Sequence, residues 1–251
     1  SHWKPDPDQE TTVTVTENLL RVACFELQYA AYNAQRSLGT PDTHHAEVRA
    51  TSQGVHIRCP AASENAYLNR LVSTERPQVS PEGVHQVDRI GHDSFGASLR
   101  ILTACPRAEG TPTTVPVRRY NATQATEFLA IVASTIGQVL DEEVVAAKKR
   151  FYCSQEFRCF VAGTDDAVEG IATTFVLRDM GWLANAYTFP AARRRGVHRA
   201  LLEVRLADAR ALGLREVFTD VVPGSDSERN LLRAGFRHVA YYSSEDSGPG
   251  S

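Results

Sequence analysis

The residues best suited to chemistry lie in the stretch TFPAARRRGVHRALL (residues 188–202), where three consecutive arginines run into a glycine. Adjacent like charges repel one another, so this cluster predicts a negatively charged partner. Arginine suits phosphate well, because its planar guanidinium group is always charged and carries several donors. The residues that we expect to surround the anion are Arg193, Arg194, Arg195, Gly196, Val197, His198 and Arg199.

A helix pattern begins at this glycine and covers residues 196–212, ending at Gly213. The first turn of a helix has backbone N–H groups without partners inside the helix, and the helix dipole adds positive charge there. A glycine lets this backbone approach a ligand closely. Charge-assisted hydrogen bonds contribute on the order of 1.5–3 kcal/mol each, so several of them predict a pyrophosphate site. The alternative is a solvated charge run, which the helix dipole disfavours without an anion.

The charge of the chain is unevenly distributed. Residues 193–237 hold ten arginines and six acidic residues, a net charge of +4, whereas the rest of the chain carries −7. The total of −3 gives no general reason to bind nucleic acid. The five cysteines form no C-x-x-C pair, so we interpret them as free thiols and expect no metal site. The chain has no run of about 18 apolar residues and no signal-peptide core, which favours a cytoplasmic protein without a membrane segment.

Strand and helix patterns alternate around the arginine cluster and predict a mixed α/β fold with the order βααβββαβαβ. The predicted strands cover residues 115–120, 156–163, 168–177, 182–189, 215–222 and 236–242, and the predicted helices cover 122–137, 141–151, 196–212 and 227–234. Upstream, the patterns indicate a helix over 16–38, a hairpin around Gly54 and a strand over 98–104. Turn-rich residues 106–116 are the best candidate for a linker.

The stretch T-x-P-x-x-R-x-R-G-x-x-x-A-L-L resembles motif A of the GNAT acyltransferase superfamily, whose pattern is Arg/Gln-x-x-Gly-x-Gly/Ala. Arg193 and Gly196 fit this pattern, while His198 stands where Gly or Ala is usual. Residues 223–236, PGSDSERNLLRAGF, resemble the Ser-x-Arg-Asn-x-x-Arg-x-Gly-Phe segment of one GNAT subgroup. The resemblance implies a GNAT fold, with a central mixed, mostly antiparallel sheet flanked by helices.

The N-terminal half faintly resembles the accessory domain of the same subgroup, which predicts a degenerate GNAT-like half. We therefore expect four parts: a disordered tag remnant over residues 1–10, the degenerate GNAT-like domain over 11–110, the acyltransferase domain over 111–243, and a disordered tail over 244–251.

The resemblance also implies where a donor such as acetyl-CoA or another acyl-CoA binds. The strand over 183–189 splays away from its neighbour, and the acyl-CoA fits into the gap. Backbone groups near Ala186 and Thr188 then bind the thioester carbonyl and the pantetheine arm, and the backbone of Arg194 to Arg199 binds the pyrophosphate. Ser227 and Asn230 lie beside the pantetheine end. The alternative for Ser227 is helix capping, which Ser225 could provide equally well.

Transfer to an amine requires the neutral amine. An alkylammonium group with a pKa of about 10.4 is deprotonated only about once in several thousand molecules at pH 7, so a general base helps. The candidate catalytic residues are Asp220 at the end of a strand, Tyr187 on the splayed strand, for which core packing is the alternative, and Ser227. His198 is interpreted as a surface histidine, with phosphate contact or a base as alternatives. Many GNAT enzymes protonate the departing thiolate with a tyrosine where this chain has Leu231, so Ser227, water or departure of an unprotonated thiolate must serve.

The predicted function is acyl-CoA-dependent N-acyltransfer, most often of an acetyl group, to a small-molecule or peptide amine. One alternative is an aminoacyl-tRNA-dependent transferase, in which the arginines bind nucleic acid and the affinity falls steeply with salt. Another is a non-catalytic acyl-CoA-binding protein, consistent with the missing tyrosine.

Overall fold

The computed structural model describes residues 47–51, 54–58, 60, 70–73, 100–106, 113–135, 137 and 139–244. The predicted helix over 16–38, the tag remnant over 1–10 and nearly all of the predicted tail over 244–251 lie outside these residues. The described strands are β1 (Glu47–Thr51), β2 (Gly54–Arg58), β3 (Arg70–Ser73), β4 (Arg100–Ala104), β5 (Val117–Tyr120), β6 (Phe157–Gly163), β7 (Val168–Leu177), β8 (Met180–Thr188), β9 (Glu216–Val221) and β10 (Arg237–Ser244). The helices are α2 (Ala125–Thr135), α3 (Glu142–Lys148), α4 (Val197–Ala211) and α5 (Asp226–Arg233), with short 3-10 helices η4 (Ala122–Gln124) and η5 (Pro190–Ala192).

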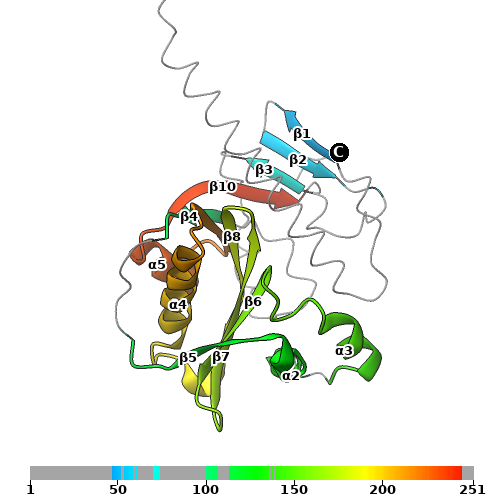
Figure 1. Ribbon diagram of the computed structural model, residues 1–251. Helices are drawn as coiled ribbons and strands as arrows, with labels where there is room; N and C mark the ends of the chain where they lie inside the picture. The colour runs from blue at the N-terminus through cyan, green and yellow to red at the C-terminus, as the bar shows by residue number, and fades with distance from the viewer. Residues whose placement is uncertain are drawn as a thin grey trace, which may run out of the picture.

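The described strands form one sheet in the order β1-β2-β3-β10-β4-β9-β8-β7-β6-β5 (Figure 1). β8 and β9 pair in parallel, and the other neighbouring strands pair antiparallel. The prediction of a mixed, mostly antiparallel sheet flanked by helices is therefore confirmed. The predicted order βααβββαβαβ is also confirmed from β5 onward, as is the hairpin around Gly54, where β1 pairs with β2.

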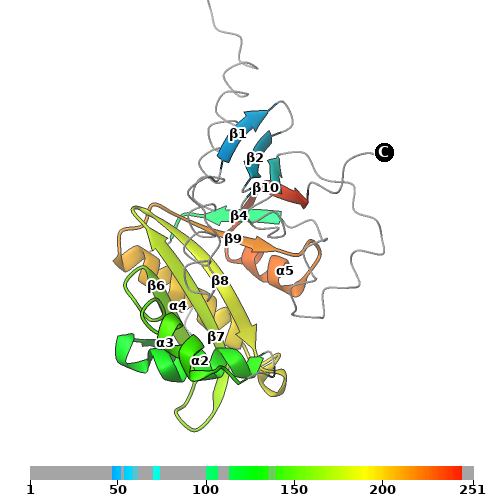
Figure 2. The same ribbon diagram turned by 90° about the vertical axis from the view of Figure 1, so that its right-hand side faces the viewer.

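Helices cover both faces of the part of the sheet formed by β5 to β8, with α2 and α3 on one face and α4 on the other (Figure 1, Figure 2). The alternation of side chains along β8 explains this arrangement. Trp182 and Ala184 are buried in a cluster with Phe128 of α2, whereas Leu183 is buried in a second cluster with Leu202 of α4. Because successive residues of a strand point to opposite faces, a strand buried on both faces is apolar without interruption.

The strands that precede the predicted linker join the same sheet as the strands that follow it. β4 pairs with β9 on one side and with β10 on the other, and β3 pairs with the C-terminal part of β10. Part of the predicted linker, residues 107–112, lies outside the described residues. The division of the chain into two domains near residue 110 stays a prediction. Strands from the two sides of this boundary are paired with each other in one sheet.

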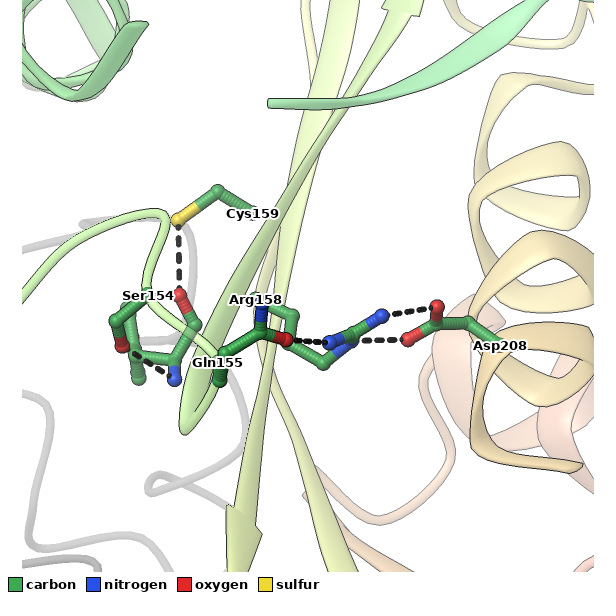
Figure 3. A network of polar contacts seen from close by, with 6 residues as sticks. Ser154, Gln155, Arg158, Cys159 and Asp208 are labelled. Atoms are coloured by element: carbon green, nitrogen blue, oxygen red, sulfur yellow. Dashed lines mark hydrogen bonds and ion pairs between the residues drawn. The ribbon is translucent and has the colours of Figure 1, made fainter. Parts of the chain in front are cut away.

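Helix α4 is fixed to the sheet by close packing and by a partly buried ion pair. An added Cβ at Gly170 of β7 would lie 2.8 Å from Val197 Cγ1 and 2.7 Å from the backbone oxygen of Tyr187, so only glycine permits this approach. Farther along the helix, Arg158 of β6 makes a bidentate contact with Asp208, with Nη2 donating to Oδ1 at 2.6 Å (Figure 3). These contacts determine where the N-terminus of α4 lies.

Candidate functional site

Strands β8 and β9 separate after a short stretch of pairing. Their parallel ladder covers Met180–Trp182 and Glu216–Phe218, and no strand within the described residues pairs with this side of β8 beyond that point. At the start of the gap, the hydroxyl of Thr219 donates to the backbone oxygen of Leu183 at 2.9 Å. The splaying that we expected after residue 183 is therefore present, and it leaves backbone groups of β8 open to a ligand.

A β-bulge lies in β8 at this gap. The register changes from Thr173↔Ala184 to Ile171↔Tyr187, so β8 contains one extra residue. Asn185 in the bulge has a left-handed φ of 49°, and its Nδ2 donates to the hydroxyl of Thr173 at 3.0 Å. Bulges change the direction of side chains and often lie beside functional sites.

The bulge changes the environment of Tyr187. Simple alternation along β8 places Tyr187 and Asn185 on one face, but the extra residue shifts Tyr187 toward the core cluster that contains Trp182. Its ring makes an edge-to-face contact with Phe189, with centroids 5.2 Å apart. Core packing, our alternative for Tyr187, is what the structure shows, and this side chain does not line the cavity described next.

A cavity of ≈ 130 Å³ lies in the gap between β8 and β9, and helices α4 and α5 form its other walls. Most of the side chains that line it are polar, and two of our predicted catalytic residues, Asp220 and Ser227, are among them. The lining residues are Leu183, Ala184, Asn185, Ala186, His198, Arg205, Thr219, Asp220, Ser227 and Leu231. Predicted residues from four separate elements thus meet around one space.

The arginine turn joins β8 to α4 beside this cavity. Arg194 has a left-handed φ of 63°, and Gly196, the N-cap residue of α4, has a φ of 84°. No side chain caps the helix there. An added Cβ at Gly196 would meet no atom within 4 Å, so the space beside this turn is open. The N-terminal N–H groups of α4 are consequently available to an anion.

The four arginines of this turn have different surroundings. Arg195 pairs with Glu169 of β7, with its Nη2 lying 2.7 Å from Oε1. Arg193, Arg194 and Arg199 are exposed, and none of them makes an ion pair with another described residue. One charge of the triplet is therefore neutralised by the protein, while its neighbours face solvent at the open helix end.

Histidine 198 is not the surface residue that we expected. His198 lines the cavity, and its Nδ1 atom is buried without a hydrogen-bond partner. Burial is the larger cause and the charge of the nearby Arg205 the smaller, and together they lower the pKa of His198 to about 4. The imidazole is consequently neutral at pH 7, so it can donate from one ring nitrogen and accept at the other.

Arg205 is a charged cavity residue that the sequence analysis missed. Its residue surface is only 3% exposed, and its Nε donates to the backbone oxygen of Leu201 at 3.1 Å. Its Nη1 donates to the backbone oxygen of Thr173, beside the bulge, at 3.3 Å. Burial lowers the pKa of Arg205 to about 10, which still leaves the side chain charged at pH 7. The one sequence signal for its burial was an arginine in the middle of an otherwise apolar face of α4.

Helix α5 brings the remaining predicted residues to the site in different ways. Ser225 is the N-cap, because its hydroxyl accepts from the backbone N–H of Glu228 at 3.1 Å. Ser227 is therefore not needed for capping and lines the cavity. Asn230 accepts from Arg233 Nη1 at 3.0 Å and is not among the lining residues. Leu231 is buried and forms part of the cavity wall.

Thr188, which we expected near the pantetheine arm, pairs through its backbone with Gly170. Its Oγ1 atom is buried and has no hydrogen-bond partner. Ala186 lines the cavity as expected. Val197, by contrast, is buried in a core cluster with Leu201, so only its backbone is suited to contact a ligand.

Residues 128–236 match the family model described as "Acetyltransferase (GNAT) family". The match supports the GNAT family for this part of the chain. Within this part, the fold and the arginine turn are those that the motif resemblance implied. The narrower subgroup with the Ser-x-Arg-Asn segment stays a prediction.

Several solved structures are similar in fold. A functionally unknown conserved protein from Staphylococcus epidermidis has 10% identity and a TM-score of 0.48, covering 79% of this chain and 92% of its own. A GCN5-related N-acetyltransferase from Sphaerobacter thermophilus has 16% identity and a TM-score of 0.45, with 58% and 49% covered. An aminoglycoside acetyltransferase from an uncultured soil metagenomic sample, in complex with sisomicin, has 15% identity and a TM-score of 0.39, with 48% and 86% covered. No curated protein matches the chain.

Three further observations concern the described residues. They contain no group of three or more His, Cys, Asp or Glu side chains that could hold a metal ion. None of their helices is long and apolar enough to span a membrane. Cys105, Cys153 and Cys159 are free thiols, while Cys24 and Cys59 lie outside the described residues.

Proposed function

We propose that this protein is an acyl-CoA-dependent N-acyltransferase that transfers an acyl group, most often acetyl, to an amine of a small molecule or peptide. The observation that carries the proposal is that an open helix N-terminus and a cavity lie side by side. The open, uncapped N-terminus of α4 with its exposed arginines lies beside a cavity in the gap between β8 and β9. An elongated ligand with a diphosphate at one end and a thioester at the other matches this arrangement.

The residues of the site fit such a donor. The backbone from Arg194 to Arg199, backed by the exposed guanidinium groups, is suited to the diphosphate. The orphaned hydroxyl of Thr188 and the open edge of β8 near Ala186 offer donors and acceptors to the amide groups of a pantetheine arm. Ser227 and the other cavity residues then surround the thioester end.

The bound acyl-CoA supplies an activated carbonyl group, and the residues of the chain assist its reaction with an amine. Backbone N–H groups at the bulge of β8 are the candidates to stabilise negative charge on the thioester oxygen, because β8 is unpaired on its β9 side there. Asp220 is a candidate acceptor for the proton of the incoming ammonium group, directly or through water, because its side chain lines the cavity. Tyr187 is a weaker catalytic candidate, since its ring packs in the core.

Calorimetric titration of the full chain with acetyl-CoA tests the proposal. We expect saturable binding, and we expect the double variant Arg193→Gln, Arg194→Gln to bind at least about tenfold more weakly, because each lost charge-assisted contact is worth on the order of 1.5–3 kcal/mol. Arg215→Gln is the matched control, because Arg215 pairs with Asp179 at an exposed position away from the cavity.

Absence of binding by acetyl-CoA and CoA would refute the proposal. A parallel titration with aminoacyl-tRNA distinguishes the alternative donor, for which affinity should fall steeply as salt rises. If CoA binds but no member of a broad amine panel is acylated, the protein is a non-catalytic binder.

A further inference from the structure

Arg205 places an unneutralised positive charge in the wall of the cavity. Its guanidinium group donates to two backbone oxygens, those of Leu201 and Thr173, and makes no ion pair with any described residue. The contrast with Arg158 is informative, because that buried arginine is matched by the carboxylate of Asp208. A buried charge without a counter-ion is costly, so a purely structural role explains Arg205 poorly.

The other charged and titratable groups around the cavity come from three elements. Helix α4 contributes His198, which is neutral at pH 7, β9 contributes the carboxylate of Asp220, and α5 contributes the hydroxyl of Ser227. Among the lining side chains, Arg205 is therefore the cation at neutral pH. The position where the resembled family has an acid is the apolar wall residue Leu231.

We propose that Arg205 stabilises the thiolate of CoA as it departs, so that the carbon–sulfur bond breaks without an acid to protonate sulfur. This inference rests on the proposed function. The amine nitrogen attacks the carbonyl carbon and the carbon–nitrogen bond forms. The electron pair of the carbon–sulfur bond passes to sulfur, and the proton of the amine passes to water. The products are the amide, the CoA thiolate and a proton.

The electrostatics of the cavity favour this role. A nearby guanidinium group lowers the pKa of a thiol, and the effect is larger where water is excluded. The carboxylate of Asp220 lies in the same wall and disfavours a thiolate, because a thiolate adds a second negative charge. The positive charge of Arg205 offsets this repulsion and so favours ionisation of the thiol. Ser227 can donate a hydrogen bond to sulfur without transferring its proton, since a hydroxyl is a much weaker acid than a thiol.

The ionisation of CoA bound to the full chain tests this proposal without any turnover. The ultraviolet absorbance of the thiolate is followed against pH in the complex, with desulfo-CoA as the blank. We expect the thiolate fraction at pH 7 to be at least about tenfold higher in the wild-type complex than in the R205M complex, as expected for loss of an adjacent charge. R205K retains a positive charge and should recover much of the effect, while Arg215→Met should change nothing.

The outcomes separate this inference from the proposed function. If CoA does not bind to the wild type, the proposed function fails and the inference fails with it. If CoA binds and its thiol ionises equally in the wild type and in a folded R205M, the inference alone is wrong. R205M could also leave the thiolate fraction unchanged but abolish a preference of the wild type for succinyl-CoA over acetyl-CoA. That result would overturn the inference and identify Arg205 as a site for an acyl carboxylate. Thermal unfolding establishes that R205M is folded, and R205K provides the comparison if it is not.

Discussion

The buried histidine of the cavity predicts a specific loss of stability in acid. His198 has its Nδ1 atom buried without a partner, and Arg205 lies close enough to repel a protonated imidazole. In the folded protein its pKa is lowered to about 4, whereas in the unfolded chain histidine titrates near its ordinary value of 6.5. Between these two values, the unfolded chain binds a proton that the folded protein does not.

The sign and the size of the effect follow from this difference. Above about pH 6.5 the histidine is neutral in both states, so it has no influence on stability. As the pH falls toward 4, proton binding by the unfolded chain lowers the free energy of unfolding. One pKa unit corresponds to about 1.4 kcal/mol, so a shift from 6.5 to about 4 predicts a loss of up to about 3 kcal/mol.

Urea unfolding of the wild type and of His198→Gln between pH 7.5 and pH 4 measures this contribution. Carboxylates titrate in both proteins and cancel in the difference, so the stability of the wild type relative to the variant should fall by up to about 3 kcal/mol on acidification. Because Arg205 is the second cause of the shift, R205M should raise the pKa of His198. A difference that stays constant with pH, or an NMR titration of His198 centred near 6.5, would show that the reasoning is wrong.

Three other perturbations test the surroundings of the site. Gly170→Ala places a Cβ 2.7 Å from the backbone oxygen of Tyr187, so thermal unfolding should show a destabilisation of about 1–3 kcal/mol, and an unchanged melting temperature would contradict the packing. Asp208→Asn leaves the charge of Arg158 buried and unmatched, for an expected cost of about 3 kcal/mol in urea unfolding; a loss below about 1 kcal/mol would contradict it. Deletion of residues 1–110 removes β4 from between β9 and β10, so cooperative unfolding should be lost, whereas a folded fragment that binds CoA would show an independent domain.

The elements after residue 113 were predictable from the sequence, because their patterns are strong and local. The run of apolar residues in β6 and β7 indicates strands buried on both faces, and helical spacing indicates α4. The uncapped helix start with its exposed arginines was also predictable, since the arginine triplet, the glycine and the helix start are adjacent in the chain, and anion binding there stays a prediction. Ser227 and Asp220 were placed correctly at the ends of their elements, and both line the cavity.

The remaining features depend on contacts between distant parts of the chain. The environment of Tyr187 is set by one extra residue in β8, and no local pattern reveals a bulge before the pairing with β7 is known. Arg205 is one of ten arginines in its segment, and its burial depends on the distance between α4 and the sheet. His198, which we interpreted as a surface histidine, lines a cavity that forms only where α4, β9 and α5 come together, and no local pattern reveals this.

The basic segment, with its net charge of +4, therefore contains two cationic environments that suit two different tasks. At the turn, the guanidinium groups of Arg193, Arg194 and Arg199 face water, where charges about 4 Å apart interact by only about 1 kcal/mol. Such groups are suited to a multiply charged diphosphate, which they would contact together with the helix end. Arg205 lies where the effective dielectric constant is lower, and one charge can shift an equilibrium by several kcal/mol. Under the proposed function, the exposed arginines would provide affinity for the donor, and the buried arginine would stabilise the single charge that forms during the reaction.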